Sequence, residues 1–228
     1  MKLQLIDKKI ETREVTSFIF KPAEPVVWKA GQFFHYVLHH EPTDERGSDR
    51  WFTISSAPFE SDVMITTRLT SEKGSSFKNA LQNLQTGESI EISDLDGDFI
   101  LDDPNKSYVF IAGGIGITPF RSIIKELDHE QKAITVTLLY ANKDQSIPFK
   151  DELETIAKKH PTFTIQYIFS PEHVDEAKIR QFVPDIKAPI FYISGPEPMV
   201  ESLGNVLKGM GISEDHIKQD WFPGYPQE

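Results

Sequence analysis

The chain has 228 residues, of which 35 are acidic and 24 basic, so that its formal net charge is -11. This balance argues against nucleic acid or an anionic membrane as the main partner. The sequence holds no cysteine, which excludes disulfides, cysteine-ligated zinc, iron–sulfur clusters and thiol catalysis within it. The first ten residues, MKLQLIDKKI, lack the apolar core of a signal peptide, and no run approaches a membrane span, so we expect a cytoplasmic protein.

Up to about residue 101 the sequence shows short alternating stretches broken by turns, the pattern of β-strands. Only residues 77–84 look helical, and the polar segment 39–49, with Pro42 and Gly47, is expected to form a loop. Many strands with one short helix predict an antiparallel barrel or sandwich. The predicted strands lie near residues 3–5, 15–20, 33–38, 50–56, 63–69 and 89–92.

After a polar break at residues 102–105, strand-like and helical stretches alternate. This alternation predicts a parallel sheet covered by helices on both faces. We therefore expect two domains, an antiparallel β domain over 1–103 and a parallel-sheet α/β domain over 104–228. The predicted strands lie at residue 109 and at 134–140, 163–169 and 190–193, and the predicted helices start at 118 and span 149–159, 175–182 and 197–210.

The second half is organised around residues 108–120, YVFIAGGIGITPF. An apolar run that ends in glycine is typical of a strand buried on both faces. We expect Thr118 to cap the following helix and Pro119 to lie in its first turn. Backbone N–H groups and the helix dipole then favour a phosphate, although such a turn also suits glycine without a ligand. The glycines of the turn are Gly113, Gly114 and Gly116.

Three further segments carry candidate binding residues. Residues 50–56, RWFTISS, combine an arginine, two aromatic rings and hydroxyl groups on one strand, which suits a flat heterocycle bearing a phosphate but also an ordinary barrel strand. Residues 73–76, KGSS, form a glycine turn before a helix. Ser194, Gly195 and Pro196 follow a buried strand, where the ligand of an open parallel sheet lies.

Two other patterns predict no metal site. His35, His39 and His40 could bring two imidazoles to one strand face, but no further ligand accompanies them. Residues 94–98, DLDGD, have the glycine too early for a calcium-binding loop. We expect these side chains to be solvated or packed.

In this order, the segments resemble the ferredoxin–NADP reductase superfamily over nearly the whole chain. The family carries R-x-[YF]-[ST]-x-x-S on a flavin-binding barrel and a glycine–serine phosphate loop, then G-G-x-G-x-T-P and C-G-P on a nicotinamide-nucleotide domain. Here the motifs stand at Arg50 to Ser56, Gly74 to Ser76, Gly113 to Pro119 and Ser194 to Pro196. Phe52 replaces the more common tyrosine, and Ser194 replaces the family cysteine.

The resemblance implies a set of binding residues. Arg50 and the amides near Ser75 and Ser76 would meet the flavin phosphate, Phe52 would lie against the flavin, and Thr53 would hydrogen-bond flavin N5. A terminal ring, Phe222 or Tyr225, would cover the flavin until nicotinamide displaces it. Thr53 and Ser194 are the expected catalytic residues. The remaining expected cofactor contacts are Trp51, Thr67, Arg68, Gly74, Gly113, Gly114, Gly116, Ile117, Thr118, Pro119, Ser170, Gly195 and Pro196.

The implied activity is that of a flavin-dependent NAD(P)H oxidoreductase. NAD(P)H would pass a hydride to FAD, or to FMN, and the flavin would pass electrons to a separate acceptor: a ferredoxin-like protein, a quinone or a small oxidant. Glu172, after Ser170 and Pro171, disfavours the 2′-phosphate of NADPH, whereas Lys143 favours it. Two alternatives stay open: a non-catalytic electron-transfer subunit, and a nucleotide-binding regulatory module without flavin.

Overall fold

The computed structural model describes residues 1–69 and 74–222. The chain divides into two compact units, Met1–Ile100 and Leu101–Glu228, called here the first and the second unit. The sequence places this boundary near residue 103. Each unit has its own sheet and its own buried apolar core.

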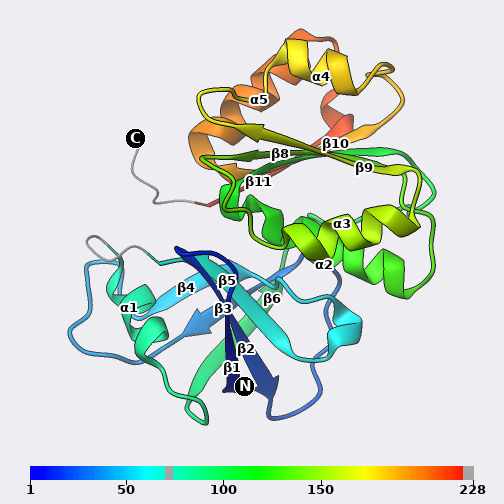
Figure 1. Cartoon of the computed structure of the whole chain (residues 1–228). Helices are drawn as coiled ribbons and strands as arrows, with labels where there is room; N and C mark the ends of the chain where they lie inside the picture. The colour runs from blue at the N-terminus through cyan, green and yellow to red at the C-terminus, as the bar shows by residue number, and fades with distance from the viewer. Residues whose placement is uncertain (70–73, 223–228) are drawn as a thin grey trace. The chain divides into compact units, whose positions relative to one another are not determined.

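The first unit is a six-stranded sheet in the order β4-β3-β6-β1-β2-β5 with antiparallel pairing (Figure 1). The edge strands β4 and β5 approach each other, since the Ser55 N–H donates to the Met64 carbonyl at 2.8 Å. The sheet thus curls into a partly closed barrel around its core. The strands are β1 (Lys2–Ile10), β2 (Val15–Pro22), β3 (Phe33–Val37), β4 (Asp49–Thr53), β5 (Val63–Arg68) and β6 (Ser89–Asp96).

One α-helix, α1 (Ser76–Asn83), closes this core, while a short 3-10 turn, η1 (Pro58–Glu60), precedes β5. Ser75 is the N-cap of α1, and its side chain accepts from the Lys78 N–H at 3.3 Å. Phe77 and Leu81, one turn apart, are fully buried and join the barrel core. The helix start is therefore fixed by both a cap and an apolar anchor.

The second unit is a five-stranded parallel sheet in the order β11-β10-β7-β8-β9. The chain enters at the central strand β7, adds β8 and β9 on one side, and then returns to add β10 and β11 on the other. The order reverses between β7 and β10, and the ligand of an open α/β sheet lies outside the carboxyl ends at such a point. The strands are β7 (Tyr108–Gly113), β8 (Val136–Asn142), β9 (Phe163–Phe169), β10 (Ile190–Pro196) and β11 (Ile217–Phe222).

Helices cover both faces of the parallel sheet, with α4 and α5 on one face and α2 and α3 on the other (Figure 1). Val109 and Ile111 of β7 belong to the core under α4 and α5. The alternate residue Phe110 points the other way and stacks on Phe120 of α2, with ring centroids 4.5 Å apart. The helical segments are η2 (Gly114–Gly116), α2 (Ile117–His129), α3 (Lys150–Lys159), α4 (Glu176–Phe182), α5 (Glu197–Gly209) and η3 (Glu214–His216).

This architecture confirms the predicted fold class, a β domain followed by a parallel-sheet α/β domain. One strand is longer than expected: the strand predicted at 190–193 continues to Pro196, where it pairs with β11. In the part of the chain that the structure describes, no helix is long and apolar enough to span a membrane.

Replacing Phe120 by alanine should lower the free energy of unfolding by about 3–5 kcal/mol, as other buried phenylalanines do. Phe120 is fully buried and stacks on the central strand, so its removal leaves a cavity between α2 and the sheet. Urea unfolding monitored by circular dichroism measures the change. Phe120→Leu, which keeps most of the apolar volume, should lose much less; equal losses for the two variants would contradict this packing.

Candidate functional site

The two glycine loops of the second unit meet at the carboxyl ends of β7 and β10. A Cβ atom on Gly116 would lie against the Ser194 carbonyl and 2.7 Å from the Gly195 nitrogen. No side chain fits between these two backbones, so residue 116 must be glycine for the loops to touch. The structure thus brings together two segments about 80 residues apart, both predicted as nucleotide contacts.

The position of Met199 explains why residues 113 and 195 are glycine. A Cβ atom on Gly113 would lie 2.5 Å from Met199 Sδ, and one on Gly195 would lie 2.9 Å from Met199 Cε. Met199 lies in the first turn of α5 and packs against the core under that helix. These two glycines therefore allow close packing of α5 on the loops, a role that sequence reasoning did not assign to them.

The start of α2 differs from the prediction for Thr118. The helix begins at Ile117 with Gly116 as its N-cap, and no side chain caps it. The preceding 3-10 turn sets this boundary one residue early, so that Thr118 lies inside the first turn and donates its hydroxyl to the Ile115 carbonyl at 3.2 Å. The expectation that Thr118 caps the helix is therefore wrong, whereas Pro119 lies in the first turn as expected.

Ser194 has a partner that sequence reasoning missed. Its fully buried side chain donates to Asp220 Oδ2 at 3.1 Å, across the β10–β11 pair in which the two residues stand opposite each other. The residue that replaces the family cysteine is thus a hydroxyl held by a carboxylate. Phe222, which ends β11, is partly buried, and Tyr225 lies outside the described residues.

The carboxyl end of β8 carries a buried polar group without a hydrogen-bond partner. Asn142 Nδ2 is buried and has no hydrogen-bond partner in the structure, while the Asn142 carbonyl accepts from the Ser170 N–H at 3.2 Å. Glu172, two residues further on, is paired with Lys178 at 2.5 Å. An unpaired amide at this edge fits a hydroxyl-bearing ligand such as a ribose.

In the first unit, Arg50 is the most buried of the expected phosphate ligands, with 8% of its surface exposed. Its Nη1 donates to the carbonyls of Arg46 at 2.7 Å and Gly47 at 3.2 Å, and its Nη2 donates to Asp44 Oδ1 at 3.1 Å. The guanidinium lies over the Phe77 ring, 5.6 Å from its centroid. Both Nη atoms of Arg50 are thus hydrogen-bonded to the loop before β4.

Asp44 joins this arginine to the start of α1. Its Oδ2 accepts from the Ser76 N–H at 2.7 Å, and its own N–H donates to Ser76 Oγ at 2.9 Å. Burial alone would raise the pKa of Asp44, but hydrogen bonds from Ser76 and Arg46 and the charge of Arg50 outweigh it and lower the pKa to about 2. The Asp44 side chain is therefore ionised near neutral pH and places a negative charge at the start of α1.

Positive charge gathers around this point. Burial and the nearby Arg46, Arg68 and Arg50 together lower the pKa of Lys78 to about 8. The Nε atoms of Arg50 and Arg68 are buried and have no hydrogen-bond partner in the structure. Several positively charged side chains that repel one another lie at this helix start. A phosphate group would reduce their repulsion and accept hydrogen bonds from them, so the residues present suit a flavin phosphate. Sequence reasoning named Arg50 and Arg68 but missed Arg46 and Lys78.

The other predicted flavin contacts lie on both faces of β4. Phe52 is half-buried and contacts Phe77, with ring centroids 5.7 Å apart. Trp51 points to the opposite face and is 50% exposed. Thr53 and Thr67 are buried. Gly74 and Ser75 precede α1 directly, whereas Lys73 lies outside the described residues.

The histidines expected to be solvated or packed all lie near β3. His35 Nε2 is 2.8 Å from Asp49 Oδ2, and His40 Nε2 is 2.9 Å from Ser76 Oγ. Among residues 1–69 and 74–222, no group of three or more histidine, aspartate or glutamate side chains is placed to hold a metal. His40 instead adds a further contact to the start of α1.

Comparison with known proteins agrees with this arrangement. The oxidoreductase NAD-binding domain family matches residues 110–204. The FAD/NAD-binding domain of nitric oxide dioxygenase from Vibrio cholerae has a similar structure, with a TM-score of 0.84 and 22% identity over 97% of this chain and 98% of that one. The chain is also 28% identical to the flavohemoprotein of Rhodopirellula baltica, over 96% of this chain and 59% of the relative.

A third relative is the ferredoxin reductase component of 3-ketosteroid-9-alpha-monooxygenase from Rhodococcus rhodochrous, 27% identical over 93% of this chain and 62% of the relative. The chain thus spans about three fifths of the length of these curated relatives. The first unit and the second unit, which contains the match to the oxidoreductase NAD-binding domain, together have the fold of the Vibrio cholerae domain. The resemblance to the ferredoxin–NADP reductase superfamily is confirmed.

Gly116→Ala should destabilise the second unit by about 1–3 kcal/mol, because the added methyl group would push the two loops apart. Gly209→Ala is the matched control: it ends α5, and a Cβ atom there has nothing within 4 Å. That change should instead stabilise the helix by about 0.5–1 kcal/mol. Urea unfolding of both variants gives the comparison, and an unchanged stability of Gly116→Ala would contradict the close approach of the loops.

Proposed function

We propose that this protein is a flavin-dependent NAD(P)H oxidoreductase. The first unit would hold FAD, or FMN, and the second unit would hold NADH or NADPH. The flavin, when bound, would supply the redox chemistry by taking a hydride from NAD(P)H and releasing electrons to an acceptor. The residues of the chain would bind and orient the two cofactors and shield the reaction from water.

One observation carries the flavin half of this proposal: the cation cluster at the start of α1. In a chain with a net charge of -11, Lys78 and three arginines lie near one helix start, and the buried Nε atom of Arg50 has no hydrogen-bond partner in the structure, while that of Arg68 lies 3.9 Å from Glu14 Oε2. Such a cluster is costly without a counter-anion. We assign the flavin phosphate to Arg50, Ser75, Ser76 and the newly found Lys78, and the flavin ring to Phe52 and Thr53.

The nucleotide half is supported by the reversal of strand order. Gly114 to Thr118 would receive the pyrophosphate at the start of α2. Ser194, held by Asp220 at 3.1 Å, and Gly195 would lie beside the nicotinamide. Asn142, with its unpaired amide, and Ser170 would contact the adenosine side. The ion pair between Lys178 and Glu172 leaves the latter less repulsive to a 2′-phosphate than its charge alone suggests.

The acceptor is proposed from chemistry and from the relatives. Without cysteine the sequence offers no iron–sulfur relay, so electrons would pass to a separate redox partner, a quinone or a small oxidant. The Rhodococcus relative is named as a ferredoxin reductase component, which supports a separate protein as the acceptor. A cytoplasmic location stays a prediction of the sequence.

An anaerobic absorbance titration tests the proposal. The purified protein, supplied with FAD or FMN if colourless, should show a flavin spectrum that stoichiometric NADH or NADPH bleaches. Titration with each nucleotide separately identifies the donor from the lower concentration required. A yellow protein that neither nucleotide bleaches would favour the electron-transfer subunit. If the protein takes up neither flavin, the nucleotide-binding regulatory module is the interpretation that stays.

The affinity for FMN, relative to that for riboflavin, should fall as the pH rises above about 8. Lys78 loses its proton near that pH, and a neutral amine no longer attracts the phosphate that riboflavin lacks. Quenching of flavin fluorescence measures both affinities. Lys78→Met should bind FMN more weakly and lose this pH dependence, whereas the exposed Lys29→Met should retain it; a wild-type ratio that stays constant with pH would contradict the assignment.

A further inference from the structure

Residues 38–48, which join β3 to β4 and are called here the β3–β4 loop, are attached to the rest of the first unit mainly through Ser76 and Arg50. His40 Nε2 lies 2.9 Å from Ser76 Oγ, and Asp44 bonds both Ser76 and Arg50. Arg50 Nη1 also donates to the carbonyls of Arg46 and Gly47. The loop therefore depends on two residues that the proposed function assigns to the flavin phosphate.

Asp44 makes the contacts that a phosphate at this position would make. One carboxylate oxygen accepts from the Ser76 N–H at 2.7 Å, and the other accepts from Arg50 Nη2 at 3.1 Å. A helix-start amide and a guanidinium are the donors that bind phosphate oxygens. A carboxylate of charge -1 and a phosphate of charge near -2 cannot share these donors, because they would repel each other at contact distance.

We propose that Asp44 is an internal anion that competes with the flavin phosphate for Ser76 and Arg50, so that flavin binding displaces the β3–β4 loop. This inference rests on the proposed function and adds a residue that sets the affinity for the cofactor. Asp44 stabilises the cations of the flavin-free protein, and the phosphate replaces it in the loaded protein.

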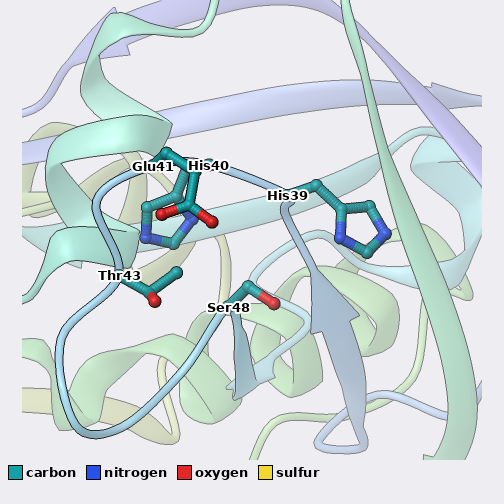
Figure 2. A pocket seen from close by; sticks show the side chains of 5 residues that line it. All are labelled: His39, His40, Glu41, Thr43 and Ser48. Carbon is teal, nitrogen blue, oxygen red and sulfur yellow. The ribbon is translucent and has the colours of Figure 1, made fainter.

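Few contacts oppose the displacement of the β3–β4 loop. No residue from 39 to 49 belongs to the buried core, and Glu41, Thr43, Glu45 and Arg46 are exposed. Five residues of the loop line a pocket of about 340 Å³: His39, His40, Glu41, Thr43 and Ser48 (Figure 2). Displacement would therefore break mainly polar contacts, together with the ring contact between His40 and Phe77, and the phosphate would restore those on Ser76 and Arg50.

Flavin binding to the flavin-free protein tests the competition. Asp44→Asn keeps the size of the side chain and an oxygen for the Ser76 N–H but removes the charge, so it should bind FMN about tenfold or more tightly than the wild type. Its affinity for riboflavin, which has no phosphate, should not change. Glu45→Gln is the matched control: it makes the same change in net charge on the neighbouring residue, without contacts to Ser76 or Arg50, and should leave both affinities unchanged.

Hydrogen exchange gives a second readout that does not depend on the variant. In the wild type, saturation with FMN should increase amide exchange of residues 40–48, because they lose their attachment to Ser76 and Arg50, while riboflavin should not. Slower exchange of this loop with FMN would contradict displacement.

The outcomes separate this inference from the proposed function. If the wild type binds FMN, but Asp44→Asn binds it no more tightly or more weakly, Asp44 orients Arg50 for the phosphate and the competition is overturned. The proposed function then stands. If neither the wild type nor any variant binds FMN or FAD, the proposed function fails, and this inference fails with it.

Discussion

The compensation of positive charge at the start of α1, where the Arg50 side chain is buried, is the constraint on which the first unit depends. Three arginines and Lys78 lie close enough to lower the pKa of the lysine to about 8, in a chain whose overall charge is strongly negative. Such a concentration of one sign is stable only beside an anion. Within the described chain Asp44 pairs with Arg50 and Glu14 lies 3.9 Å from Arg68 Nε, and we propose the flavin phosphate as an external anion for the same cations.

The second unit obeys a different constraint, the close approach of two backbones. The glycine loop after β7 and the loop after β10 touch where strand order reverses, and Met199 packs on both. These contacts fix the position of the start of α2 relative to Ser194. The glycine loop after β7 is therefore held by packing within the sheet and helices, and it does not need a ligand to take its shape.

The fold was predictable because its determinants are local. Alternating apolar residues predicted the strands of the first unit, and the alternation of strand-like and helical stretches predicted the parallel sheet of the second. The exceptions depend on contacts between distant residues. Thr118 does not cap α2 because a 3-10 turn, packed against Ser194, starts the helix earlier. Asp44 and Lys78 were missed because their partners, Ser76, Arg50 and Arg68, come together only when the loop, β5 and α1 have folded.

A structure of the protein crystallised with FMN tests the central claim most directly. We expect the phosphate within hydrogen-bonding distance of the Ser76 N–H and the Arg50 guanidinium, near Lys78, with Asp44 no longer bonded to Ser76. A phosphate bound at another place, with the contacts of Asp44 to Ser76 and Arg50 intact, would contradict it.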